Sequence, residues 1–353
     1  MNVQTRYLLH RFLLSMFLVF LLSGCSPSGD QDKNITSTPK STGSELTAND
    51  TGISSKADAA PDDFPYEFKQ VANNTWVMQG PLEMPNPENK GFMNNPGFVQ
   101  TTAGLVVIDP GSTVQVGEKI LARMKKISDK PIVAVFNTHI HGDHWLANQA
   151  VKAAYPNVKI YGHPEMLKAI EDGEGKNWVN LMDTLTKGAS LGTEVVAPDH
   201  SIDHNNIIKV GDTQFRIHHY GVAHTNTDIM IEAVENSVVF LGDNVLAQRI
   251  PRTSDGTFQG NISAIKNILV SNIKIYVPGH GPTGDRAMVE DYLNYLTLIY
   301  AAAKKAFDED LDSSDVLAIT KETTAAYKDW AGYDDLLGPH GAQAYAEIEE
   351  AEF

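Results

Sequence analysis

One short segment of the chain contains four side chains of the types that bind divalent metal ions. The segment THIHGDH, residues 138–144, lies between a run typical of a β-strand and a run typical of a helix. Its first two histidines are two positions apart, so an extended backbone would place both imidazoles on one side. We expect Gly142 to permit a sharp turn after them. The four candidate ligands are His139, His141, Asp143 and His144.

Three more ligand-type residues follow separate apolar runs, where glycine or proline ends a predicted strand. They lie in GVAHT (221–225), FLGDN (240–244) and VPGHGP (277–282), and the candidate ligands are His224, Asp243 and His280. Imidazole and carboxylate groups suit zinc, and also iron or manganese. Metal scavengers tend to use flexible histidine-rich tracts, whereas single ligands at strand ends favour catalysis.

The order HxHxDH, His, Asp, His resembles that of the metallo-β-lactamase superfamily, from about Phe64 to Gly284. The resemblance implies an α/β fold, a four-layer αββα sandwich, with two divalent metal ions, zinc first and iron or manganese otherwise. It implies that His139, His141 and His224 bind one ion, that Asp143, His144 and His280 bind the other, and that Asp243 bridges both. A metal-bridging hydroxide would be the nucleophile, with Asp143 moving its proton. Asp109 matches a position that supports a ligand histidine.

The resemblance leaves several functions open. Asp243 stands where many metallo-β-lactamases have a cysteine, so hydrolysis of an ester, thioester or lactone carbonyl is the leading expectation. The alternatives are a β-lactamase, a mono-iron persulfide dioxygenase and a non-catalytic zinc-binding envelope protein. Seven candidate ligands are too many for one tetrahedral site, which favours two metals.

Two loops near the predicted ligands contain residues that could contact a small-molecule substrate. Residues 81–96 include Phe92, and residues 247–260 include Arg249 and Arg252, which could bind a carboxylate. The other histidines of the predicted domains match no ligand position and are interpreted as structural: His163, His200, His204, His218, His219 and His340. The tryptophans are interpreted as packing residues: Trp76, Trp145, Trp178 and Trp330.

The apolar periodicity predicts strands mixed with helices in two successive halves, as in a layered α/β domain. Strands are expected at 67–71, 75–79, 97–101, 105–108, 132–137, 158–161, 207–210, 214–220, 229–233, 238–241 and 273–277. Helices are expected at 114–126, 145–154, 164–171, 177–187 and 258–269. We therefore expect a hydrolase domain at residues 64–284 and a C-terminal helical extension packed on it at 285–353.

The first 25 residues have the features of a bacterial lipoprotein signal peptide. Two arginines precede an apolar run at 12–22, and LSGC follows, ending in Cys25. The run is short for a permanent membrane span, and LSGC resembles a lipobox, in which the cysteine is lipidated. Residues 26–63 are polar and predict a flexible tether. We expect a lipid-anchored protein of the bacterial cell envelope, in the outer membrane and facing the periplasm.

The charge and the cysteine content limit the possible partners. The formal net charge of −16 disfavours nucleic acid, because a negative surface repels phosphate backbones. Membrane attachment would then depend on the lipid rather than on basic patches. Cys25 is the only cysteine, so the metal site would have no thiolate ligand. No feature of the sequence indicates an oligomeric state.

The lipid anchor gives a first testable prediction. Cys25→Ser removes the thiol that would carry the lipid, so the variant should lose lipid labelling and leave the membrane fraction. Metabolic labelling with a fatty acid and cell fractionation measure both effects. Unchanged labelling of the variant would contradict the lipobox interpretation.

Overall fold

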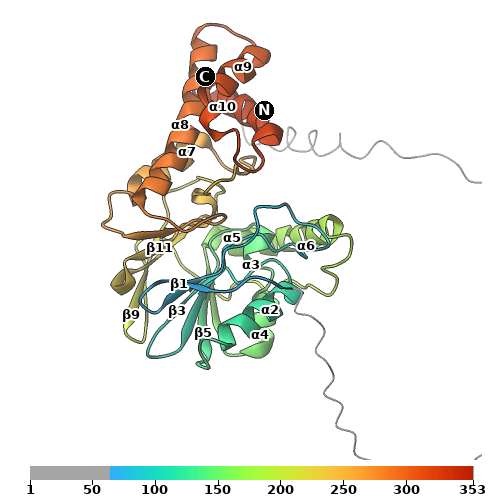
Figure 1. Cartoon of the computed structure of the whole chain (residues 1–353), viewed down its shortest axis with the longest axis vertical. Coiled ribbons are helices and arrows are strands. Elements are labelled where there is room, and N and C mark those ends of the chain that lie inside the picture. The colour runs from blue at the N-terminus through green and yellow to red at the C-terminus, as the bar shows by residue number, and fades with distance from the viewer. Residues whose placement is uncertain (1–63, 353) are drawn as a thin grey trace, which may run out of the picture. The chain divides into compact units, whose positions relative to one another are not determined.

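The computed structural model of the protein describes residues 64–352. The expected signal peptide, Cys25 and the tether lie outside the described residues. Two β-sheets lie face to face between layers of helices, which confirms the predicted αββα class (Figure 1). Among the helices between Phe64 and Glu352, none combines the length and the apolarity that are needed to cross a bilayer.

The first sheet has seven strands arranged in chain order. They are β1 (Lys69–Ala72), β2 (Thr75–Val77), β3 (Gly97–Gln100), β4 (Leu105–Ile108), β5 (Ile132–Phe136), β6 (Lys159–Gly162) and β7 (His200–Ser201). The first four strands pair antiparallel, and β4 to β7 pair parallel.

The second sheet has five strands in the order β12-β11-β10-β9-β8. They are β8 (Ile207–Val210), β9 (Thr213–His218), β10 (Met230–Ala233), β11 (Val238–Phe240) and β12 (Ile275–Val277). Only β11 and β12 of this sheet pair parallel; the other pairs are antiparallel.

The apolar run of β4 shows why the first sheet needs a layer on each face. Side chains alternate along a strand, and Val106 and Ile108 join the core between the two sheets. Leu105 and Val107 join the core on the outer face, where α2 and α4 pack. A strand that is buried on both faces reads as a continuous apolar run, as this one does.

The helices form the outer layers (Figure 1). Their bounds are α2 (Val114–Lys125), α3 (Gly142–Trp145), α4 (Asn148–Ala154), α5 (Pro164–Glu171), α6 (Glu174–Leu185), α7 (Phe258–Ile268), α8 (Arg286–Asp308), α9 (Ser313–Thr323) and α10 (Tyr333–Ala351). Three 3-10 turns are η1 (Val234–Asn236), η2 (Gly242–Asn244) and η3 (Ala325–Tyr327). Side-chain oxygens of Thr113, Thr257 and Asp285 cap the N-termini of α2, α7 and α8.

The last three helices share one core with the outer face of the second sheet. Tyr276 of β12 and Val239 of β11 are buried in the same cluster as Tyr292 and Ile299 of α8. Helix α10 contributes Ile348 to this cluster and packs against α8 and α9. Residues 286–351 therefore pack against the sandwich through apolar contacts.

Candidate metal centre

Seven ligand-type side chains meet where strands of both sheets end. His139 follows β5 of the first sheet, and Asp243 in η2 follows β11 of the second sheet. His280 follows β12, and His224 lies in the loop between β9 and β10. The short helix α3 adds Asp143 and His144. All seven residues are buried, although five of them also line a cavity, namely His141, Asp143, His224, Asp243 and His280.

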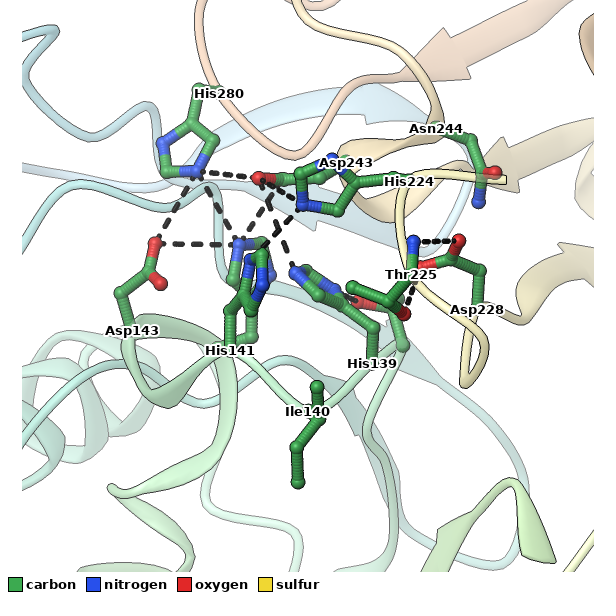
Figure 2. Close-up of polar contacts among 12 residues, drawn as sticks. His139, Ile140, His141, Asp143, His224, Thr225, Asp228, Asp243, Asn244 and His280 are labelled. Carbon is green, nitrogen blue, oxygen red and sulfur yellow. Dashed lines mark hydrogen bonds and ion pairs between the residues drawn. The ribbon is translucent and has the colours of Figure 1, made fainter. Parts of the chain in front are cut away.

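The first group consists of three imidazoles and one carboxylate. The ligand atoms of His139, His141, His224 and Asp243 all lie within 4.8 Å of one another. His224 Nε2 lies 3.0 Å from His141 Nδ1, and 3.6 Å from Asp243 Oδ2. Figure 2 shows these rings turned toward the Asp243 carboxylate.

The second group consists of Asp143, His144 and His280. Its ligand atoms also lie within 4.8 Å of one another. Asp143 Oδ2 lies 3.4 Å from His144 Nε2 and 3.3 Å from His280 Nε2. Asp243 contacts this group too, with Oδ1 3.2 Å from His144 Nε2 and Oδ2 3.3 Å from His280 Nε2. Asp243 therefore lies between the two groups, as a bridging ligand must.

Acceptors behind the rings fix which nitrogen of each histidine faces the centre. Asp109 Oδ2 lies 2.8 Å from His144 Nδ1, and Asp109 also accepts the backbone N–H and the hydroxyl of Thr138. The Thr138 hydroxyl is 2.9 Å from His139 Nδ1. His280 Nδ1 donates to the carbonyl of Met93 at 2.7 Å. Such partners orient metal ligands and select their tautomer.

Asp255 holds His141 in a comparable way. Its Oδ2 lies 3.0 Å from His141 Nε2, which leaves Nδ1 facing His224. In the sequence Asp255 is one polar residue of a loop, with no spacing that marks it as a partner of His141. Contact between residues 114 positions apart is visible only in the structure.

Glycine is required where the backbone passes the bridging carboxylate. A Cβ atom at Gly279 would lie 1.9 Å from Asp243 Oδ1, closer than any side chain allows. Gly142 has a different role from the expected turn, since its φ is not positive. A Cβ there would lie 3.0 Å from both Leu146 and Trp178, so Gly142 permits close packing of α3 against α6.

Burial keeps part of the first group neutral. It lowers the pKa of His139 well below its usual value and lowers the pKa of His224 to about 3. Both imidazoles are therefore uncharged at pH 7, which is the form that binds a metal.

The second group holds opposite charges together. Burial alone would raise the pKa of Asp143 and of Asp243, but His144 and His280 hold both pKa values well below the usual range. The same attraction raises the pKa of His144 and of His280 against the effect of burial. The two buried carboxylates thus demand positive charge, which a divalent cation would supply in place of these protons.

The donor set fits divalent metal ions. In the described part of the chain, His139 Nε2, Asp143 Oδ2 and Asp243 Oδ1 are buried without a hydrogen-bond partner, and each belongs to one of the two groups. Buried polar atoms without a partner are rare because they cost free energy. A metal ion in each group would satisfy all three atoms.

A cavity of about 340 Å³ opens over the two groups. Arg249 and Arg252, which the sequence analysis singled out in this loop, both line it. Arg249 is buried, and its guanidinium donates to the carbonyl of Leu82 and contacts the sulfur of Met84. Phe92, in contrast, is buried in the core against Phe64 and Tyr66, so the expected substrate contact is corrected to a packing role.

Helix α6 supplies an apolar wall of the cavity that the sequence interpretation missed. Trp178, Leu181, Met182 and Leu185 all line the cavity, and the Trp178 ring lies 4.8 Å from the ring of His141. Trp178 is therefore more than a packing residue. The spacing i, i+3, i+4, i+7 places these four residues on one face of a helix, and this pattern is readable in the sequence.

Helix α10 also contributes to the cavity wall. Leu336 of α10 lines the cavity directly. His340 Nε2 donates to the carbonyl of Pro251 at 2.8 Å, and Tyr295 of α8 lies 2.9 Å from His340 Nδ1. Burial lowers the pKa of His340 to about 4, so this histidine is a neutral structural link at pH 7.

Two further side chains of α10 hold the same loop. Gln343 bonds both the hydroxyl and the carbonyl of Thr253, at 2.5 and 2.8 Å. The carboxylate of Glu347 accepts the backbone N–H of Phe258 at 2.8 Å. The loop that carries Arg249, Arg252 and Asp255 is thus fixed between the second sheet and the C-terminal helices.

The family model of the metallo-β-lactamase superfamily matches residues 89–280, more than half of the chain. The chain belongs to the metallo-β-lactamase superfamily. The match ends before α8 begins, so the helices that hold the cavity loop lie beyond the part shared with the superfamily model.

Two proteins of known name match this chain in part. A linear primary-alkylsulfatase from Pseudomonas sp. is 36% identical over 109 residues, which are 29% of this chain and 20% of the relative. A hydroxyacylglutathione hydrolase from Gloeothece citriformis is 41% identical over 59 residues, 17% of this chain and 21% of the relative. The matched regions thus span about a fifth of the length of these two relatives.

A solved structure supports the fold assignment over a longer stretch. The stereoselective inverting sec-alkylsulfatase from Pseudomonas sp. superposes with a TM-score of 0.62 and 16% sequence identity. The superposition covers 80% of this chain and 50% of that one.

The contact between Asp109 and His144 gives a second prediction. Asp109→Asn keeps the size of the side chain and its tolerance of the left-handed backbone (φ +50°), but its amide holds the Nδ1 proton of His144 less well. We expect a loss of about 10- to 100-fold in metal affinity or in hydrolytic activity, with the fold intact. Metal titration and circular dichroism measure the two effects. Wild-type metal affinity and activity in this variant would show that Asp109 does not support the metal ligand His144.

Proposed function

We propose that the protein is a metal-dependent hydrolase that cleaves an ester, thioester or lactone carbonyl of a small amphiphilic molecule. The proposal rests on one observation above the others: the cavity over the metal groups has apolar walls and two arginines. We also propose that Cys25, which lies outside the described residues, anchors the protein in the cell envelope through a lipid.

We assign all seven ligands to two metal ions, zinc in the first instance. Bound together, the two ions would acidify a water molecule and stabilise the negative charge that develops on the substrate oxygen. Asp143 borders the cavity, so its carboxylate can accept the proton of an attacking water and deliver it to the leaving group. Asp109 contacts the ring of His144, and Asp255 contacts the ring of His141. These contacts keep both rings oriented during the proton transfer.

The walls favour a substrate with an apolar chain and an anionic group. Trp178, Leu181 and Leu185 offer apolar surface, and Leu336 adds to it from α10. Arg249 is buried beside the metal groups, where a guanidinium can bind a carboxylate or a sulfate through paired hydrogen bonds.

Hydrolysis of an alkyl sulfate ester is the second candidate. The same apolar chain and the same arginines would bind an alkyl sulfate, and this chain resembles two alkylsulfatases, one in sequence and one in fold. The two candidates differ in the group that is cleaved. A carboxylic ester is cleaved at its carbonyl carbon, whereas an alkyl sulfate is cleaved within its C–O–S linkage.

A substrate panel tests the proposal and gives a third prediction. It contains aliphatic p-nitrophenyl esters, an acyl thioester, an acyl lactone, decyl sulfate and a penicillin, all tested on one zinc-loaded preparation. We expect kcat/KM for the best carbonyl ester, thioester or lactone to exceed that for the penicillin at least about 100-fold, or roughly 2.7 kcal/mol in barrier. Comparable efficiency on the penicillin would make β-lactamase the leading function.

The panel also separates the remaining alternatives. Sulfate release from decyl sulfate without ester cleavage would replace the proposal by its second candidate. Oxygen consumption on a persulfide, measured beside the panel on an iron-loaded preparation, would indicate a dioxygenase. Inactivity of the loaded protein on every substrate would favour a metal-binding protein. Arg249→Met serves as the matched variant: KM should rise for substrates with an anionic group and stay unchanged for a neutral ester.

A further inference from the structure

A second cluster of ligand-type residues lies outside the seven-residue centre. His163, Asp203 and His219 bring three ligand atoms within 4.8 Å of one another, the same spacing as in the two groups of the centre. His163 is buried, His219 is half-buried and Asp203 is exposed, so the cluster is open to solution. In the sequence these residues are 16 to 56 positions apart and carry no spacing typical of a metal site.

The three residues come from both sheets. His163 follows β6 and Asp203 follows β7, which are neighbours in the first sheet. His219 follows β9 of the second sheet and begins the loop that carries His224. An ion held by all three would link the ends of the two sheets beside that loop.

Two of the ligands already have the orientation that a metal site needs. His219 Nδ1 donates to the carbonyl of Asp228 at 2.7 Å, which leaves the lone pair on Nε2 available. Asp203 accepts the backbone N–H of His204 at 2.6 Å, and its Oδ1 lies 3.5 Å from His163 Nε2. The rings of His163 and His219 are stacked, with centroids 4.1 Å apart and planes at 24°.

His163 requires one adjustment. Its Nδ1 accepts the backbone N–H of Glu165 at 3.3 Å and so caps α5, which places the ring proton on Nε2. When a metal binds Nε2, the proton of the neutral ring must lie on Nδ1. His163 Nδ1 can then no longer accept the backbone N–H of Glu165, so one long cap bond is lost. That loss is small beside the bonds that a divalent ion forms with two imidazoles and a carboxylate.

We propose that His163, Asp203 and His219 form a third metal site, separate from the seven-residue centre, that binds a borderline divalent cation such as Zn²⁺. Two imidazoles and one carboxylate favour zinc or copper over magnesium or calcium, which prefer oxygen ligands alone. Three protein ligands leave the fourth position to water. The site has a structural role, since it joins the two sheets where the His224 loop begins.

Zinc content tests the proposal. The full-length protein is saturated with zinc, freed of loosely bound ions on a desalting column and analysed by mass spectrometry. Wild type should retain one zinc ion per chain more than Asp203→Asn and more than His163→Asn. Asparagine at 163 preserves an N-cap for α5, so loss of zinc from that variant is not explained by a lost cap. The comparison uses the difference between proteins and does not depend on how many ions the centre holds.

A matched variant and a second measurement complete the test. Asp199→Asn removes an exposed carboxylate close in sequence that belongs to none of the three groups, and should keep the wild-type zinc content. Added zinc should raise the Tm of wild type by about 2–4 °C more than the Tm of Asp203→Asn. Equal zinc content and equal Tm shifts in wild type and both site variants would overturn the third site.

Discussion

Two carboxylates, Asp143 and Asp243, are buried among five imidazoles, and the rest of the structure serves to keep them there. A buried charge is tolerated only when it is paired or bound to a metal. Here the nearby His144 and His280 partly supply the compensating charge, and three buried ligand atoms remain without a hydrogen-bond partner. Burying these charges and unpartnered atoms costs free energy of folding, and bound divalent ions would offset this cost.

The surrounding elements follow from this constraint. The sandwich brings the ends of β5, β11 and β12 together, although these strands belong to different sheets. Gly279 clears the space for the Asp243 carboxylate, and Asp109 and Asp255 hold the backs of two ligand rings. Beyond the centre, α6 and α10 form the cavity walls. The cavity walls are therefore formed largely by residues outside the strands that position the metal ligands.

Much of the fold and the seven candidate ligands of the centre could be predicted from the sequence, whereas the cluster of His163, Asp203 and His219 could not. The ligands lie at the ends of apolar runs, and a strand end is a local signal. Element boundaries were less predictable: the expected helix at 145–154 is split into α3 and α4, and the two-residue strand β7 gives no pattern. Contacts between distant segments were not predictable, because the partnership of Asp255 with His141 and the packing of Phe92 depend on tertiary structure.

We propose that the seven residues hold two metal ions with Asp243 between them. Anomalous X-ray diffraction at the zinc edge, on crystals of the zinc-loaded protein, tests it most directly. We expect two strong peaks about 3.5–4 Å apart, one beside His139, His141 and His224 and the other beside Asp143, His144 and His280. A single peak at this centre in fully loaded crystals, or two peaks with Asp243 turned away from both, would rule out a two-metal centre bridged by Asp243.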